Sequence, residues 1–223
     1  MEKIIKIKII TLGASDVGKT SIINRIVSKK FSEQMVSTTG IDKNIIERDY
    51  KTKNLKMLLE FTDTAGQEQY CDLPKQYIRG CHIVLLVFCD LGSLEELKNR
   101  WFRLYKDNAN LEKSKFIVVI NKSDTFGEKR DEINNSGELF AEEINNSFFI
   151  SCSAKNEDNI DNLENHILKE AKDIINKEEE EEEKKGGGRM SRISTKSQRI
   201  VCEENITVNK NNVQVQIKTG TCC

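Results

Sequence analysis

The chain lacks the features that mark membrane-spanning and secreted proteins. No run of apolar residues approaches the roughly 18 that a transmembrane helix needs. The first ten residues mix charged side chains with isoleucine too evenly for a secretory signal peptide. We therefore expect a chain that is made and kept in the cytosol.

Cysteines with metal-binding spacing and an excess of one charge are also absent. None of the seven cysteines has Cys-x-x-Cys spacing, and four fall in or beside expected core segments: Cys71, Cys81, Cys89 and Cys152. Such cysteines usually act as small buried apolar residues, so neither a disulfide nor a zinc site is indicated. The formal net charge of −1 gives no overall attraction for nucleic acid, and we expect no nucleic-acid partner.

Size and composition predict one domain with a tail. The 223 residues, 37% of them hydrophobic, can bury one substantial core, which we place in residues 1–176. Residues 177–223 lose the apolar period and contain six consecutive glutamates (178–183) and then six lysines or arginines (184–199) without an acid. We expect a flexible tail whose glutamates extend the last helix or form a self-repelling spacer, a specific acidic docking site being the alternative.

Apolar patterns predict an α/β fold. Strands are expected at residues 3–10, 44–50, 55–61, 83–88, 116–120 and 148–150, and helices at 19–28, 137–145 and about 160–175. A further helix would begin at Ser93, with Glu96 completing a capping box. Polar residues 51–54 indicate an antiparallel hairpin, and the later strands alternate with helices. We expect three layers, a mostly parallel six-stranded sheet with helices on both faces, and ligands at the carboxyl ends of its strands.

Residues 13–20 read Gly-Ala-Ser-Asp-Val-Gly-Lys-Thr and match the phosphate-loop pattern GxxxxGK(S/T) between a strand and a helix. The glycines let backbone N–H groups face phosphate oxygens, and the helix aims its positive end at the same anion. Lys19 would supply charge to the outer phosphates, and Thr20 would hold magnesium. The other residues expected to bind the phosphates are Ser15, Asp16, Val17, Gly18 and Ser21.

Asp63-Thr64-Ala65-Gly66-Gln67 follows the third expected strand. Asp63 is placed to hold magnesium through its water shell, and the Gly66 N–H could meet a terminal phosphate. Gln67 would act in catalysis by orienting a water molecule. Taken alone, an aspartate at a strand end is more often a cap or a turn former.

Two further motifs follow later strands and indicate guanine. In Asn121-Lys122-Ser123-Asp124, the last carboxylate can accept from the ring N–H and the exocyclic amine of guanine, a donor pair that adenine does not offer. In Ser153-Ala154-Lys155, the alanine N–H could meet the guanine carbonyl oxygen, and the lysine could pack along the base. The two motifs together favour GTP over ATP.

These motifs, in this order, resemble those of small GTPases of the Ras superfamily over about residues 3–176, and most closely those of the Rab family. Rab-like segments are residues 37–42 (STTGID), 63–68 (DTAGQE), 77–80 (YIRG) and the pair Cys222-Cys223. The resemblance implies a P-loop GTPase fold that binds GTP or GDP with Mg²⁺ and hydrolyses GTP to GDP. It also implies that Thr38 closes over magnesium and the γ-phosphate and that Phe31 lies against guanine.

The same resemblance implies the partners of a membrane-anchored switch in vesicle trafficking. They are an exchange factor, a GTPase-activating protein, effectors, a GDP-dissociation inhibitor and the prenylation machinery, which would lipidate Cys222 and Cys223. We expect a monomer on the cytosolic face of an intracellular membrane that cycles with the cytosol. A Ras- or Rho-like signalling GTPase and a hydrolysis-deficient GTP-binding scaffold are the alternatives. The double cysteine speaks against the first, and the presence of Thr38 and Gln67 against the second.

Departures from the Rab pattern fall on the partner surface. Rab proteins usually carry an aromatic residue and a tryptophan where this chain has Lys43 and Thr62, and only Tyr77 of that contact patch is kept. Effector identity is therefore not carried over. Pro74, the only proline, falls in the second switch and should stiffen it locally.

Overall fold

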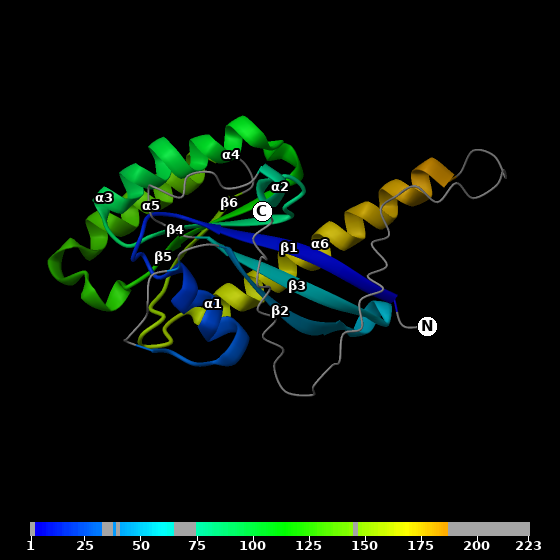
Figure 1. Cartoon of the computed structure of the whole chain (residues 1–223), viewed down its shortest axis with the longest axis horizontal. Helices are drawn as coiled ribbons and strands as arrows, with labels where there is room; N and C mark the ends of the chain where they lie inside the picture. Colours follow the sequence, from blue (N-terminus) through cyan, green and yellow to red (C-terminus); the bar gives the residue numbers. More distant parts are fainter. Residues whose placement is uncertain (1–2, 33–37, 39–40, 65–74, 145–146, 187–223) are drawn as a thin grey trace, which may run out of the picture.

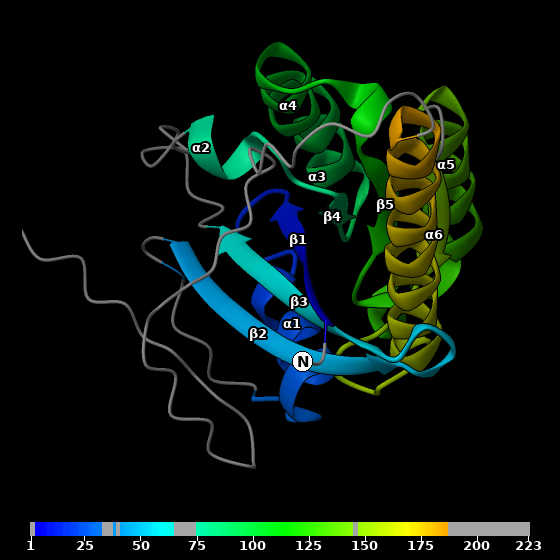
Figure 2. The ribbon, with the colours of Figure 1, turned by 90° about the vertical axis from the view of Figure 1, so that its right-hand side faces the viewer.

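The computed structural model describes residues 3–32, 38, 41–64, 75–144 and 147–186. Six strands form one sheet in the order β2-β3-β1-β4-β5-β6. The sheet is seen from two directions in Figures 1 and 2. Only the β2–β3 pair is antiparallel, so the predicted mostly parallel sheet is confirmed. The strands are β1 (Lys3–Leu12), β2 (Ile41–Tyr50), β3 (Leu55–Thr64), β4 (Ile83–Phe88), β5 (Lys115–Ile120) and β6 (Ser147–Ser151).

Helices cover both faces of the sheet. One buried cluster joins the sheet to α1 (Lys19–Ser28) and α6 (Ile160–Gly186), and a second joins its other face to the remaining long helices. Those helices are α3 (Leu91–Glu96), the π-helical η3 (Leu97–Phe102) and α4 (Arg103–Asn108), which run on as one rod, and α5 (Arg130–Glu143). The short elements are α2 (Lys75–Ile78), η1 (Lys51–Lys53), η4 (Leu111–Lys113), η5 (Ser123–Thr125) and η6 (Gly127–Lys129).

The burial pattern explains the layers. Every residue of β4 is buried, because its continuous apolar run is covered on both faces. In β1, Ile7 and Ile9 enter the cluster with α1 and α6, whereas Ile10 and Leu12 enter the other. Cys81 and Cys152 are buried with free thiols, as the sequence predicts; Cys89 is half-buried and Cys71 lies outside the described residues.

The prediction that Ser93 begins a helix is wrong. The helix begins at Leu91, and its N-cap is Asp90, whose Oδ1 accepts from the Ser93 N–H at 2.7 Å. The Asp90 N–H in turn donates to Ser93 Oγ at 3.0 Å, so a reciprocal capping box forms three residues earlier than expected. Glu96 instead accepts from the Trp101 indole N–H at 3.2 Å.

Helix α5 begins at Arg130, seven residues before the predicted start at Gly137. Its first turns are polar, but Ile133 is buried in the cluster with Phe140, and this packing overrides the weak local preference for a helix. Gly137 is needed in the middle of this helix, because a Cβ there would lie 2.7 Å from the Phe149 ring.

Helix α6 continues through the glutamates to Gly186, and its last turns project beyond the sheet in Figure 1. Glu179 pairs with Lys53 of η1 and with Lys3 of β1, the latter at 2.9 Å. The glutamates up to Glu183 therefore extend the last helix, whereas the domain division at residue 176 stays a prediction. In the part of the chain that the structure describes, no helix is long and apolar enough to cross a bilayer.

Candidate functional site

The predicted site residues gather at one edge of the sheet. The phosphate loop follows β1, Asp63 lies near the end of β3, and the motifs that begin at Asn121 and Ser153 follow β5 and β6. Parallel strands bring these loops together because their carboxyl ends meet at the same edge. Gly66, Gln67, Cys222 and Cys223 lie outside the described residues.

The phosphate loop requires both of its glycines. Gly13 has a φ of +154°, and a Cβ there would lie 2.1 Å from the carbonyl oxygen of Val87 on β4. Gly18 has a φ of +88°, and a Cβ there would lie 2.2 Å from the side-chain nitrogen of Asn121. Neither position has room for a larger residue, so the loop packs directly against its neighbours.

Lys19 is buried inside this loop, with 6% of its surface exposed. Its Nζ donates to the carbonyl oxygens of Gly13 at 3.0 Å and Ala14 at 2.7 Å. Burial lowers the pKa of Lys19 to about 8, partly opposed by the charges of Asp63, Glu96 and Asp16. A phosphate anion would restore the charged form, so the lysine is poised for an anionic ligand.

Three oxygen-bearing side chains meet beside this lysine. Thr20 Oγ1 donates to Asp63 Oδ2 at 2.5 Å and lies 3.0 Å from Thr38 Oγ1. Asp63 is fully buried, and burial raises the pKa of its carboxyl, opposed by the Thr20 hydrogen bond and the Lys19 charge. Hydroxyl and carboxylate oxygens are hard ligands that suit Mg²⁺, with phosphate oxygens and water filling the other positions.

Sequence analysis missed Thr11, which orients this aspartate. Thr11 Oγ1 donates to the Thr62 carbonyl oxygen at 3.2 Å and lies 3.4 Å from Asp63 Oδ1. The signal was a single buried hydroxyl in the apolar strand that leads into the phosphate loop. Only the parallel pairing of β1 with β3 connects it to the site.

The two motifs expected at the base are tied to each other and to the phosphate loop. Asn121 donates through Nδ2 to the Val17 carbonyl at 2.9 Å and accepts through Oδ1 from the Ala154 N–H at 3.0 Å. Asp124 is exposed, and its Oδ1 accepts from Ser153 Oγ at 2.5 Å. A guanine carbonyl would therefore share the Ala154 N–H with Asn121.

Lys122 and Phe31 also border this region. Lys122 Nζ lies 3.0 Å from the carboxylate of Asp16 in the phosphate loop. Phe31 is partly buried against the core cluster that contains α1. Arg25 on α1, which sequence analysis missed, contacts the Phe31 ring and the carbonyl oxygens of Ala154 and Lys155.

The region around Lys43 and Thr62, where the sequence departs from the Rab pattern, is organised around a buried carboxylate. Glu60 pairs with Lys6 and, at 3.1 Å, with Lys43, and these lysines lower the pKa of Glu60 against the opposing effect of burial. Lys43 Nζ also lies 5.3 Å from the centroid of the Tyr77 ring, a cation–π contact. Thr62 is buried in β3. A lysine paired with Glu60 and a buried threonine thus stand where Rab proteins usually carry an aromatic residue and a tryptophan.

Comparisons with known proteins agree with this geometry. Residues 8–173 match the family model described as the Ras family. The chain is 35% identical over 158 residues to Ras-related protein SEC4 of Saccharomyces cerevisiae, covering 70% of each chain. It is 33% identical over 162 residues to Ras-related protein Rab-9B of Mus musculus, covering 71% of this chain and 79% of the relative. It is 31% identical over 174 residues to Ras-related protein Rab-12 of Homo sapiens, with coverages of 77% and 68%. The chain belongs to the Ras family and is a Rab-type small GTPase, an enzyme that hydrolyses GTP.

Proposed function

We propose that the chain is a membrane-anchored switch in vesicle trafficking, set by GTP and reset by slow hydrolysis to GDP. The meeting of Thr20, Thr38 and Asp63 is the observation that carries this proposal. The three side chains come from α1, from the segment before β2 and from β3. A ligand that joins them therefore joins three separate parts of the chain.

The phosphate end supplies binding and a conditional contact. Lys19 holds the outer phosphates, and Thr20, Thr38 and Asp63 hold magnesium, which neutralises charge on the phosphate oxygens when bound. Thr38 has no place in a helix or strand, so its position depends on what it contacts. Loss of the γ-phosphate removes one of those contacts and releases the segment.

Hydrolysis is assigned to Gln67, which orients the attacking water. Residues 32–42 contain no arginine that could stabilise the transition state from within the chain. As in small GTPases generally, intrinsic turnover should then be slow and an activating protein should accelerate it with an arginine of its own.

The base end selects guanine. Asp124 accepts from the ring N–H and the exocyclic amine, while Asn121, Lys122 and Ser153 hold the surrounding loops. Lys155 packs along the base, opposite the contact expected from Phe31. Adenine would leave the carboxylate without its donor pair, which disfavours ATP.

Membrane attachment is assigned to Cys222 and Cys223. Two prenyl chains give stable anchoring where one gives only marginal binding. The basic stretch at residues 184–199 would add attraction to an anionic leaflet, and α6 would hold the domain away from it. The family implies an exchange factor, an activating protein, a GDP-dissociation inhibitor and effectors as partners. The Lys43–Glu60 pair implies effectors that differ from those that bind the aromatic patch of other Rab proteins.

Two experiments test this function. Purified chain should bind fluorescent GDP in magnesium, and single-turnover hydrolysis of bound GTP should be lost in Gln67→Leu while GDP binding is retained. A chain that binds no guanine nucleotide, or a variant that hydrolyses GTP as fast as the parent, would contradict the proposal.

A tagged Cys222→Ser/Cys223→Ser chain should leave membranes for the cytosol, and unchanged membrane localisation would refute the anchor.

A further inference from the structure

Arg25 joins the helix of the phosphate end to the loop of the base end. It lies on α1, six residues or about 9 Å along the helix axis from Lys19. Its side chain is 14% exposed, and its three guanidinium nitrogens donate to three backbone carbonyls. The acceptors are Ala154 at 2.7 Å, Lys155 at 2.9 Å and Lys29 at 3.2 Å.

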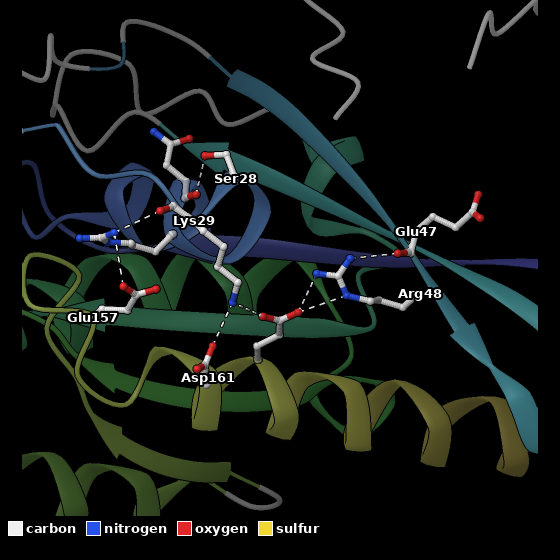
Figure 3. Close-up of polar contacts among 9 residues, drawn as sticks. Ser28, Lys29, Glu47, Arg48, Glu157 and Asp161 are labelled. Atoms are coloured by element: carbon white, nitrogen blue, oxygen red, sulfur yellow. Dashed lines mark hydrogen bonds and ion pairs between the residues drawn. The ribbon is translucent and has the colours of Figure 1, made fainter. Parts of the chain in front are cut away.

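Arginine suits this position for a geometric reason. Its planar group presents five N–H donors in a rigid fork, so two of its nitrogens can bind consecutive carbonyls of one loop at the same time. The bond to Ala154 is partly buried, which strengthens it because water competes less for that carbonyl. Glu157, whose carboxylate is 3.7 Å from Nη1, adds a partly exposed ion pair, visible in Figure 3.

The same guanidinium lies against the aromatic residue expected beside the base. The Arg25 Cζ atom is 5.5 Å from the centroid of the Phe31 ring, within the range of cation–π attraction. Phe31 and the 154–155 loop come from separate parts of the chain, before β2 and after β6. Both are expected to contact guanine, and both are held by one side chain.

We propose that Arg25 is a positioning residue for guanine-nucleotide retention. It holds the 154–155 loop and Phe31 at a set position relative to α1, so it controls how slowly GDP leaves the site. The inference rests on the proposed guanine site and names the residue that organises its base end. Arg25 touches no phosphate-binding side chain in the contacts that the structure describes.

A neighbouring arginine provides a matched control. Figure 3 shows Lys29 and Arg48 directed at one carboxylate on α6, that of Glu164, at 2.9 Å and 2.7 Å. Arg48 also donates to the Glu47 carbonyl at 3.0 Å. Arg48 makes three hydrogen bonds, as Arg25 does, but none of those three reaches Phe31 or the 154–155 loop.

The test is the release of fluorescent GDP in magnesium from the parent, Arg25→Gln, Arg25→Lys and Arg48→Gln. Release from Arg25→Gln should be about tenfold faster or more, since two charge-assisted bonds to the loop are lost. The GDP release rate of Arg25→Lys should lie between those of the parent and Arg25→Gln, because an ammonium group keeps the charge but lacks the planar fork. Arg48→Gln should stay within about twofold of the parent, since its bonds do not reach the loop. Single-turnover GTP hydrolysis by Arg25→Gln should fall by a smaller factor than its release rises.

Contrary results for the variants and for the parent chain have different meanings. The inference would be overturned if folded Arg25→Gln released GDP at the parent rate, or if Arg48→Gln accelerated release equally. It would also be overturned if hydrolysis by Arg25→Gln fell by the same factor as its GDP release rose. If Arg25→Gln does not fold, Arg25→Lys decides, and parent-like release from it overturns the inference. A parent chain without affinity for GDP would overturn the proposed function instead.

Discussion

The oxygen cluster at the phosphate end and the 154–155 loop at the base end are built from different kinds of contact. In the oxygen cluster, side chains meet side chains, with Thr20 Oγ1 3.0 Å from Thr38 and 2.5 Å from Asp63. The 154–155 loop is held through its backbone, with Asn121 accepting from the Ala154 N–H at 3.0 Å and Arg25 donating to the Ala154 carbonyl at 2.7 Å. Contacts between side chains can be exchanged for contacts to a bound ligand. Contacts from side chains to backbone can hold the loop whether or not a ligand is bound.

This difference assigns different tasks to the two ends. An exchangeable cluster can respond to magnesium and to the γ-phosphate, which is what a switch requires. A loop held through its backbone should keep one shape in both states, as the proposed selection of guanine requires. Helix α1 carries residues of both ends, Lys19 and Arg25, so the two are joined by one rigid element.

The most damaging change should be Gly18→Ala, which affects both ends. The new Cβ would lie 2.2 Å from the Asn121 side chain at a φ of +88°, so strain and overlap should together cost roughly 2–6 kcal/mol. GDP affinity, measured by fluorescence titration, should fall severely. Gly92→Ala is the control, because its Cβ would meet only Asp90 Oδ1 at 3.4 Å. Comparable GDP affinity in the two variants would refute the tight packing of the loop.

Asp124→Asn should damage the base end alone. The amide cannot accept from two donors as the exposed carboxylate can, so GDP affinity should fall by about 2–3 kcal/mol, or roughly a hundredfold. Xanthosine diphosphate, with a carbonyl in place of the amine, should be penalised less. Competition titrations of both nucleotides measure this, with the exposed Asp131→Asn as control. An equal loss for both nucleotides would contradict the role of Asp124.

Alkaline pH should weaken the phosphate end alone. The pKa of Lys19 is lowered to about 8 without ligand, and bound phosphate raises it again, so binding takes up a proton above that pH. GDP affinity should therefore fall as pH rises through about 8, by up to about tenfold per pH unit. Calorimetry at about pH 8.5, in buffers of different ionisation enthalpy, should detect this proton uptake on GDP binding. The same measurement at about pH 6.5 should detect little proton uptake. Binding without proton uptake at the higher pH would rule out a neutral Lys19.

Arg48→Gln should affect neither end and should only lower stability. Glu164 would lose one of two cations that lower its pKa against the effect of burial, which should reduce the unfolding free energy by about 1–2 kcal/mol. Chemical denaturation of the GDP-bound protein measures this change. A loss above about 4 kcal/mol would show that the network is part of the core.

Local motifs made most of the fold and site predictable. The residue pairs Lys19–Thr20 and Asn121–Asp124 lie in short runs directly after apolar strands, and sequence alone places such runs at one sheet edge. The sheet was predictable for the same reason, since β4 and residues 116–120 of β5 are uninterrupted apolar runs.

Contacts between distant segments were not predictable. Arg25 binds carbonyls about 130 positions away in the chain, and no spacing within α1 marks it as different from another surface arginine. Thr11 likewise acquires its role only through pairing of β1 with β3. The helix after β4 was misplaced because Asp90 and Ser93 are both good N-caps, and the reciprocal bond between them decides which one serves.

The most direct test of the division between the two ends is GDP release with magnesium and with excess chelator. The parent, Thr20→Ala and Arg25→Gln should be compared side by side. Chelator should accelerate release from the parent and from Arg25→Gln by similar factors, because both keep the oxygen cluster of Thr20, Thr38 and Asp63. Thr20→Ala should release GDP fast in magnesium already and respond little to chelator. An equal response of all three to chelator would contradict the account.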